Sequence, residues 1–103
     1  MTYFAVWATD NPGMLGQRLR VRDAHRARLR DPQGHAVRVI AGGPTLDDTA
    51  DAAMNGSLLV IEAETIEAVR RFVAGDPYML AGVYASVDVR RWEWALGRPV
   101  PMP

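Results

Sequence analysis

Four short runs of apolar, β-branched and aromatic residues divide the chain, and turn-forming residues such as glycine, proline and aspartate bound them. This pattern is typical of β-strands. The predicted strands are residues 3–8, 36–41, 57–63 and 83–94. The Gly-Gly-Pro stretch at 42–44 is expected to end the second strand as a turn, and the small, acidic residues 45–55 are expected to form a solvated connection.

Two segments between these strands have the composition and spacing of α-helices. Residues 14–30 contain no proline, and residues 66–73 repeat apolar side chains at helical spacing. Thr65 is the predicted N-cap of the second helix and Gly75 its stop. Asp76, which stands before a proline, predicts the cap of one short extra turn.

The order βαββαβ predicts an α+β, ferredoxin-like fold, with a four-stranded antiparallel sheet and two helices on one face. The other face is expected to be polar if it meets water. Instead, residues 3–8 are apolar on both faces, and Tyr84, Trp92 and Trp94 share one face of the last strand while the valines share the other. We therefore expect a homodimer that covers the helix-free sheet face.

Length and composition narrow the function. The 103 residues predict one domain, residues 1–103, with a proline-rich tail at 97–103. Twelve basic residues balance twelve acidic ones, so neither nucleic acid nor a membrane surface is an expected partner. No segment has the roughly 18 apolar residues of a membrane span, and the N-terminus does not resemble a signal peptide. The expected location is the cytoplasm.

Missing residue types exclude several chemistries. The chain has no cysteine and no lysine, which excludes thiol catalysis, iron–sulfur clusters and Schiff bases. Only His25 and His35 are available for a zinc site, so no metal is expected, and no cofactor either.

The first predicted helix carries the best candidates for chemistry. On a helical wheel His25 and Arg22 fall inside the apolar sector, three residues apart and on the same face. From the residues alone, the favoured interpretation is a buried histidine hydrogen-bonded to a carbonyl and an arginine that extends to solvent. The apolar sector is formed by Met14, Leu15, Leu19, Val21 and Leu29.

Asp76 has two interpretations. It is a good helix cap, and the end of the second helix is also expected to lie beside the first helix, where a carboxylate could orient His25 as a general base.

The other candidate residues are weaker. His35 is expected to be a solvated strand start. Gly43 could let a ligand approach the backbone closely. The arginines at 90–91, next to tryptophans, are expected to pack rather than bind bases.

Four motifs in register resemble the YciI-like family over nearly the whole chain. They lie at residues 18–29, 41–44, 56–61 and 74–84. The family is a branch of the dimeric α/β-barrel superfamily, in which ferredoxin-like protomers pair through their sheets. The resemblance therefore implies the same fold and the same homodimer that the strand pattern predicts.

The resemblance also implies site residues. The family's active site is a His–Asp pair, which maps onto His25 and Asp76, and this reverses the preference for a merely structural histidine. Arg22 and Tyr78 match the family's arginine and aromatic residue. Asp23 departs from the family, in which proline is frequent at this position, so the start of the helix and the orientation of Arg22 are open. Within the motif at 41–44, Gly43 and Pro44 are expected substrate-binding residues.

Relatives are linked to lyase and isomerase chemistry on small cyclic or phenolic compounds, such as muconolactone isomerisation and dehydrochlorination. The first hypothesis is a cofactor-independent lyase or isomerase in which His25 is the general acid or base, Asp76 its partner and Arg22 a clamp for an oxyanion. The second is a non-catalytic homodimer that binds a small ligand or a partner protein. The third is a haem-dependent or quinone-type oxygenase, in which His25 is the one candidate iron ligand.

Overall fold

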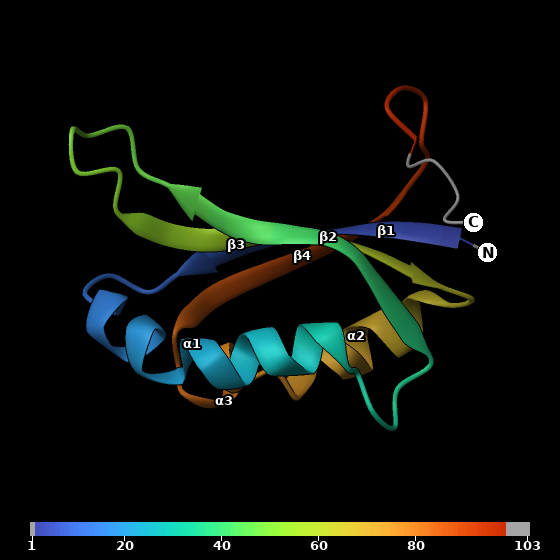
Figure 1. Ribbon diagram of the computed structural model, residues 1–103, viewed down its shortest axis with the longest axis horizontal. Helices are drawn as coiled ribbons and strands as arrows, with labels where there is room; N and C mark the ends of the chain where they lie inside the picture. Colours follow the sequence, from blue (N-terminus) through green and yellow to red (C-terminus); the bar gives the residue numbers. More distant parts are fainter. Residues whose placement is uncertain (1, 99–103) are drawn as a thin grey trace.

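The computed structural model describes residues 2–98, which form a sheet with all helices on one of its faces (Figure 1). The strands are β1 (Thr2–Asp10), β2 (Val37–Leu46), β3 (Met54–Ala63) and β4 (Tyr84–Trp92). The helices are α1 (Leu15–Arg30), α2 (Ile66–Ala74) and the single turn α3 (Pro77–Leu80).

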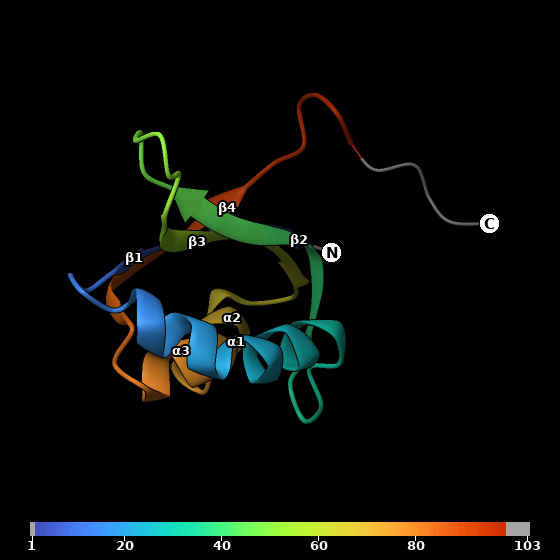
Figure 2. The ribbon, with the colours of Figure 1, turned by 60° about the vertical axis from the view of Figure 1, so that its left-hand side comes forward.

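The sheet order is β2-β3-β1-β4, and every neighbouring pair is antiparallel. With α1 between β1 and β2, and α2 and α3 between β3 and β4, the chain has the predicted ferredoxin-like α+β fold. Seen from the side, α1 and α2 form one layer beneath the sheet (Figure 2). No helix within the described residues is both long and apolar enough to cross a bilayer.

The predicted helix ends follow from local chemistry. Thr65 caps α2 by accepting a hydrogen bond from the backbone N–H of Ala68 at 3.2 Å, and Gly75 ends that helix. Asp76 caps α3 in the same way, with Pro77 at the first helical position. α1 begins at Leu15 without a side-chain cap. Asp23, where the family often has proline, therefore lies well inside α1.

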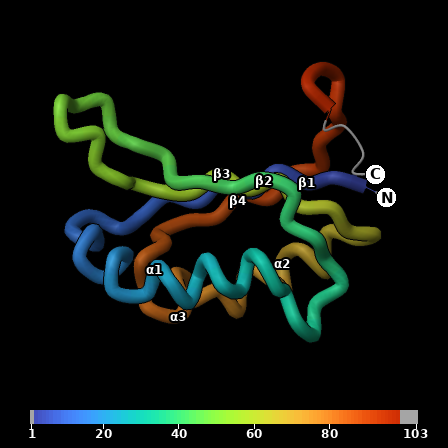
Figure 3. Tube along the Cα trace, in the orientation of Figure 1, coloured from blue at the N-terminus to red at the C-terminus, as the bar shows by residue number. Residues whose placement is uncertain are grey.

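β2 continues beyond its predicted end. The prediction that residues 42–44 form a turn was wrong, because β2 runs through them to Leu46, and the hairpin turn stands clear of the helical layer (Figure 3). Pro44 is tolerated because β2 is an edge strand, where a missing N–H can face solvent. Gly42 packs closely against β3, since a Cβ there would lie 2.7 Å from Cδ2 of Leu59 and would require that side chain to move. The ends of the expected 45–55 connection are therefore strand residues.

The core fills the space between the sheet and α2. Side chains from alternate positions of β1 and β3 meet the apolar face of α2, as the period of two in the strands requires. The buried core residues are Phe4, Val6, Leu59, Ile61, Ala63, Val69, Phe72 and Val73.

Tyr84 lies on the helix-covered face of the sheet, whereas the alternation of β4 predicted the open face. The cause is a bulge in β4: Thr9 pairs with Ser86, but Asp10 pairs with Tyr84, so Ala85 has no partner in β1. The extra residue reverses the direction of the side chain that precedes it. Tyr84 is consequently buried beside Tyr78.

The face of the sheet opposite the helices exposes large apolar side chains. Trp7 and Leu58 are paired across β1 and β3 on this face, and they are 53% and 42% exposed. The apolar character that the strand pattern predicted is therefore present, and such a patch is characteristic of an interaction surface.

Candidate active site

The most buried side chains of α1 are polar, although Val21 and Leu29 of this helix also pack against the core. α1 buries two side chains, those of Arg18 and His25, which are 2% and 5% exposed. Leu15 and Leu19 were predicted to lie in the buried sector, but each is about half exposed. Arg18 and His25 are seven residues apart and lie nearly in line, whereas Leu19 is rotated by about 100° from Arg18. The buried stripe of α1 is centred on its charged residues rather than on its leucines.

His25 and Asp76 form a buried pair. Nδ1 of His25 lies 2.8 Å from both carboxylate oxygens of Asp76. Oδ1 of Asp76 also accepts a hydrogen bond from the backbone N–H of Tyr78 at 2.8 Å. The two interpretations of Asp76, helix cap and histidine partner, thus hold at the same time. The carboxylate directs Nδ1–H toward itself and leaves Nε2 of His25 as the nitrogen with a free lone pair.

The ring of Tyr78 packs against both buried side chains of α1. It stacks on the His25 ring with centroids 3.9 Å apart and planes inclined by 22°. The guanidinium carbon of Arg18 lies 4.3 Å from the centroid of the same ring, in cation–π contact. Burial raises the pKa of Tyr78, and the charge of Arg18 acts in the opposite direction. Tyr78 is therefore an uncharged spacer that fixes both side chains.

These residues border a cavity of about 120 Å³ between α1 and β2. Five of the six predicted site residues line it, and the sixth, Asp76, lies behind His25. Because β2 continues through residues 42–44, Gly43 and Pro44 reach the cavity as strand residues. The lining residues are Arg18, Arg22, His25, Arg26, Leu29, Gly42, Gly43, Pro44, Met54, Ser57 and Tyr78.

Arg18 is a site residue that the sequence interpretation missed. Its Nε donates to Oδ2 of Asp10 at 2.8 Å, and its Nη2 donates to the carbonyl of Gly56 at 2.6 Å and to Oγ of Ser57 at 2.7 Å. Burial alone would lower the pKa of Arg18, but the hydrogen bond and charge of Asp10 outweigh it and raise the pKa. The available signal was position: Arg18 precedes His25 by seven residues and shares its face.

Ser57 joins this network to β4. Its Oγ also receives a hydrogen bond from the phenol of Tyr84 at 2.8 Å. Burial raises the pKa of the Tyr84 phenol far above its usual range, so that the phenol keeps the proton it donates. The bulge in β4 is what brings this hydroxyl to the site.

The other candidates lie elsewhere. His35, predicted to be solvated, is half-buried; its Nε2 is 3.1 Å from Nη2 of Arg28, and its ring contacts Phe72 edge-on. Arg90 forms an exposed ion pair with Asp88. Within residues 2–98, no three side chains of the metal-ligating types gather into a metal site.

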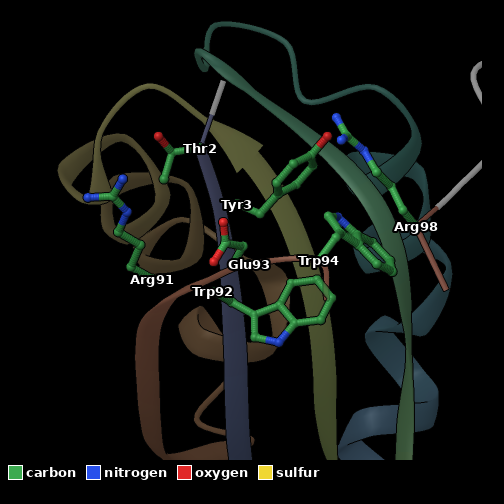
Figure 4. A pocket seen from close by; sticks show the side chains of 7 residues that line it. All are labelled: Thr2, Tyr3, Arg91, Trp92, Glu93, Trp94 and Arg98. Atoms are coloured by element: carbon green, nitrogen blue, oxygen red, sulfur yellow. The ribbon is translucent and has the colours of Figure 1, made fainter. Parts of the chain in front are cut away.

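A larger cavity, of about 570 Å³, shares no lining residue with the site. Figure 4 shows aromatic side chains from the start of β1 and the end of β4 around it. It contains no histidine and its carboxylate, Glu93, has no histidine partner, so it lacks the acid–base pair of the smaller cavity. The residues around it are Thr2, Tyr3, Arg91, Trp92, Glu93, Trp94 and Arg98.

Known proteins resemble this chain over most of its length. An uncharacterized protein of Haemophilus influenzae is 38% identical over 91 residues, which cover 85% of this chain and 93% of the relative. Protein YciI of Escherichia coli O6:H1 is 37% identical, covering 84% and 92%. Among solved structures, a 5-chloro-2-hydroxyhydroquinone dehydrochlorinase from Burkholderia phenoliruptrix AC1100, in complex with 2,5-dihydroxybenzoquinone, is 37% identical with a TM-score of 0.74 over 88% of this chain and 93% of that one.

The model of one family, described as the YCII-related domain, matches residues 2–93, from the first strand to just beyond the last. The matched region includes every residue of the His25–Asp76 site. The chain therefore belongs to the family of YCII-related domain proteins.

Proposed function

We propose that this protein is a cofactor-independent lyase or isomerase that acts on a small cyclic or phenolic metabolite, with His25 as its general acid and base. The observation that carries the proposal is the buried His25–Asp76 pair at the wall of a cavity. The dehydrochlorinase from Burkholderia, a relative of this chain at 37% identity, supports the reaction class.

The arrangement suits proton transfer to and from carbon. Asp76 holds Nδ1–H, so Nε2 of His25 can take a proton from a substrate C–H bond, and the carboxylate stabilises the imidazolium that results. The electron pair of that bond moves into the ring system. In an isomerisation, a different carbon takes the proton back from Nε2. In the loss of HCl from a chlorohydroquinone, Nε2 takes a proton from a phenolic O–H and gives it to the ring carbon that carries chlorine. Deprotonation of a second hydroxyl then supplies the electron pair that expels chloride and leaves the quinone.

The size of the cavity supports a substrate with a single ring. A volume of about 120 Å³ is smaller than the roughly 300–1,000 Å³ of pockets for drug-sized ligands. It is also too small to take a porphyrin, which argues against the haem-dependent alternative. Arg22 and Arg26 at the cavity wall favour substrates that carry negative charge.

Turnover of two candidate substrates tests the proposal. We would measure chloride release from 5-chloro-2-hydroxyhydroquinone and double-bond migration in muconolactone. His25→Asn should lower turnover by a factor of about 10²–10⁴, the usual contribution of a general acid or base. His35→Asn is the matched control, because His35 lies outside the cavity, and it should retain native turnover. Equal turnover in the native protein and His25→Asn would contradict the proposal.

The second candidate function is a non-catalytic homodimer that binds a small ligand or a partner protein. The cavity supports it as well as it supports an enzyme. It predicts that 2,5-dihydroxybenzoquinone binds without turnover of either substrate, and that binding survives Asp76→Asn. Loss of turnover with retained binding in Asp76→Asn favours the enzyme instead.

We also propose that the protein is a homodimer through the open face of the sheet, where Trp7 and Leu58 are exposed. Burial of such apolar area contributes roughly 25 cal/mol per Å². Sedimentation equilibrium should give twice the monomer mass for the native chain and a monomer for Trp7→Glu. The same mass for both would refute this interface.

A further inference from the structure

One part of the cavity wall holds hydrogen-bond donors that have no acceptor within residues 2–98. An arginine carries five N–H donors on three nitrogens. The hydrogen bonds that Arg18 makes within residues 2–98 use Nε and Nη2, which reach Asp10, Gly56 and Ser57. Nη1 makes none, although Arg18 is 2% exposed and lines the cavity. Within the described residues the sealed side-chain atoms without a partner are Nη1 of Arg28 and Nε1 of Trp94, so Nη1 of Arg18 is open to the cavity and available to a ligand atom.

Ser57 is a second donor of this kind. Its Oγ receives hydrogen bonds from Nη2 of Arg18 at 2.7 Å and from the phenol of Tyr84 at 2.8 Å. These two bonds occupy both lone pairs of the oxygen, so the hydroxyl hydrogen is left to donate. Ser57 is buried and lines the cavity, and its hydroxyl donates to no acceptor within residues 2–98.

The charges around the cavity agree with these donors. No carboxylate lines the cavity, because Asp10 is paired with Arg18 and Asp76 lies behind His25. Arg22 and Arg26 line it as well, and neither forms an ion pair within the described residues. The cavity thus combines a positive field with fixed donors, which is the combination that binds an anionic oxygen.

We propose that Nη1 of Arg18 and the hydroxyl of Ser57 form a preorganised receptor for an anionic oxygen of the substrate, so that the substrate class of this site is an ionised phenol, enol or carboxylic acid. The inference deepens the proposed function and rests on it for the reaction. Asp10 and Tyr84 are positioning residues: Asp10 holds the guanidinium, and Tyr84 occupies the serine lone pair so that the serine donates.

The receptor explains how His25 can remove a proton from carbon. As Nε2 takes the proton, the electron pair of the C–H bond is delocalised through the ring onto the oxygen held by Arg18 and Ser57. Donors that are already in place stabilise this developing charge without reorganisation. When another carbon takes the proton, the charge on that oxygen falls again. In the loss of HCl, the oxygen in the receptor is the deprotonated phenol, and its charge falls as the carbon that carries chlorine takes the proton.

Ligand binding tests the receptor separately from catalysis. The probes are 2,5-dihydroxybenzoquinone, a vinylogous acid that is ionised at neutral pH, and the uncharged single-ring compound hydroquinone. Calorimetry with the native protein should show tighter binding of the anion. Ser57→Ala should weaken binding of the anion about tenfold, the usual effect of losing a hydrogen bond to a charged group. It should change hydroquinone affinity less than about threefold.

Three further variants complete the design. Ser86→Ala is the matched control, because Ser86 is exposed and pairs with Thr9 on the open face of the sheet. It should bind the anion like the native protein. Arg18→Lys keeps the charge but loses the fork of donors, and should weaken anion binding at least tenfold. His25→Asn should lose turnover and keep anion binding, which separates this inference from the proposed function.

Several results would overturn the receptor. They are native-like anion binding by folded Ser57→Ala, equal losses for the anion and for hydroquinone, and no binding of the anion by the native protein at millimolar concentration. If Ser57→Ala loses anion binding while His25→Asn retains turnover, the receptor stands and the proposed function fails. Amide NMR spectra of each variant establish that it is folded.

Discussion

The two long helices cover the same face of one sheet, yet they bury opposite kinds of side chain. α2 buries Val69, Phe72 and Val73, which pack on the apolar core. α1, which lies beside it (Figure 2), buries Arg18 and His25. Burial of apolar area stabilises the fold, whereas burial of charge costs free energy unless the charge is paired. The helical layer is therefore divided into one helix for stability and one for chemistry.

The partners of α1 show how its polar face is tolerated. Arg18 is paired with Asp10 at the end of β1, and His25 is paired with Asp76 at the start of α3. Each partner lies on another element, so the buried polar face of α1 is satisfied only in the folded protein. α2 needs no such partners, because its buried face carries no polar group.

The largest loss of stability is expected from a substitution on the buried apolar face of α2. Phe72→Ala should lower the free energy of unfolding by about 4 kcal/mol, because Phe72 is completely buried and its removal leaves a cavity. Urea unfolding measures the change. Leu80→Ala is the control, since Leu80 is 75% exposed and its loss should cost within about 0.5 kcal/mol. Similar values for the two variants would mean that the buried face of α2 does not stabilise the fold.

A smaller loss of stability is expected from a substitution of a buried polar residue of α1. Arg18→Met should lower the free energy of unfolding by about 3 kcal/mol, because it leaves the buried Asp10 carboxylate without its cation. Adding Asp10→Leu should restore most of that loss, since apolar residues can replace a buried ion pair at little cost. The double variant should still fail to bind 2,5-dihydroxybenzoquinone. A double variant as unstable as the single one would mean that the ion pair itself stabilises the fold.

Alkaline pH should lower the free energy of unfolding through the tyrosines that pack around the buried side chains of α1, and not through the apolar core beneath α2. Burial raises the pKa of Tyr84, and to a lesser degree that of Tyr78, so the folded state holds these protons more tightly than the unfolded state. The stabilisation is complete below about pH 10, the usual tyrosine pKa, and is lost as the pH rises through the folded value. The free energy of unfolding should fall there by up to about 1.4 kcal/mol per pH unit for each of these tyrosines.

Tyr84→Phe should reduce that slope markedly, as measured by urea unfolding between pH 9 and about 11.5. In this pH range the tyrosines are the side chains that titrate, because the chain has no lysine or cysteine and arginine stays charged. Phe72→Ala keeps all of them and should keep the native slope. An unchanged slope in Tyr84→Phe would mean that its phenol is not protected in solution.

Features with short-range causes could be predicted from the sequence. The caps at Thr65 and Asp76 depend on backbone groups within three residues, and the structure confirms both. The extent of β2 and the face of Tyr84 depend on pairing with distant strands, and both predictions were wrong. Alternation along a strand carries no information about a bulge, because a bulge is a property of two strands.

Part of the site could also be predicted from the sequence, and part could not. The helical wheel identified His25 and Arg22 as polar residues on a buried face, and the family resemblance added Asp76. Arg18 was missed because its partners Asp10 and Ser57 are 8 and 39 residues away in the sequence. The position of Arg18 on the face of His25 indicated burial, but its hydrogen-bond partners could be assigned only from the pairing of distant strands.

The bulge at Ala85 makes the register of β4 as important to the site as its composition. In a regular ladder Ala85 would stand opposite Asp10, and the alternation from Val87 would turn the Tyr84 phenol to the outer face of the sheet. Ser57 would then lose its donor although no residue that lines the cavity had changed. One extra residue at the edge of the sheet therefore completes the hydrogen bonds of a pocket that it does not touch.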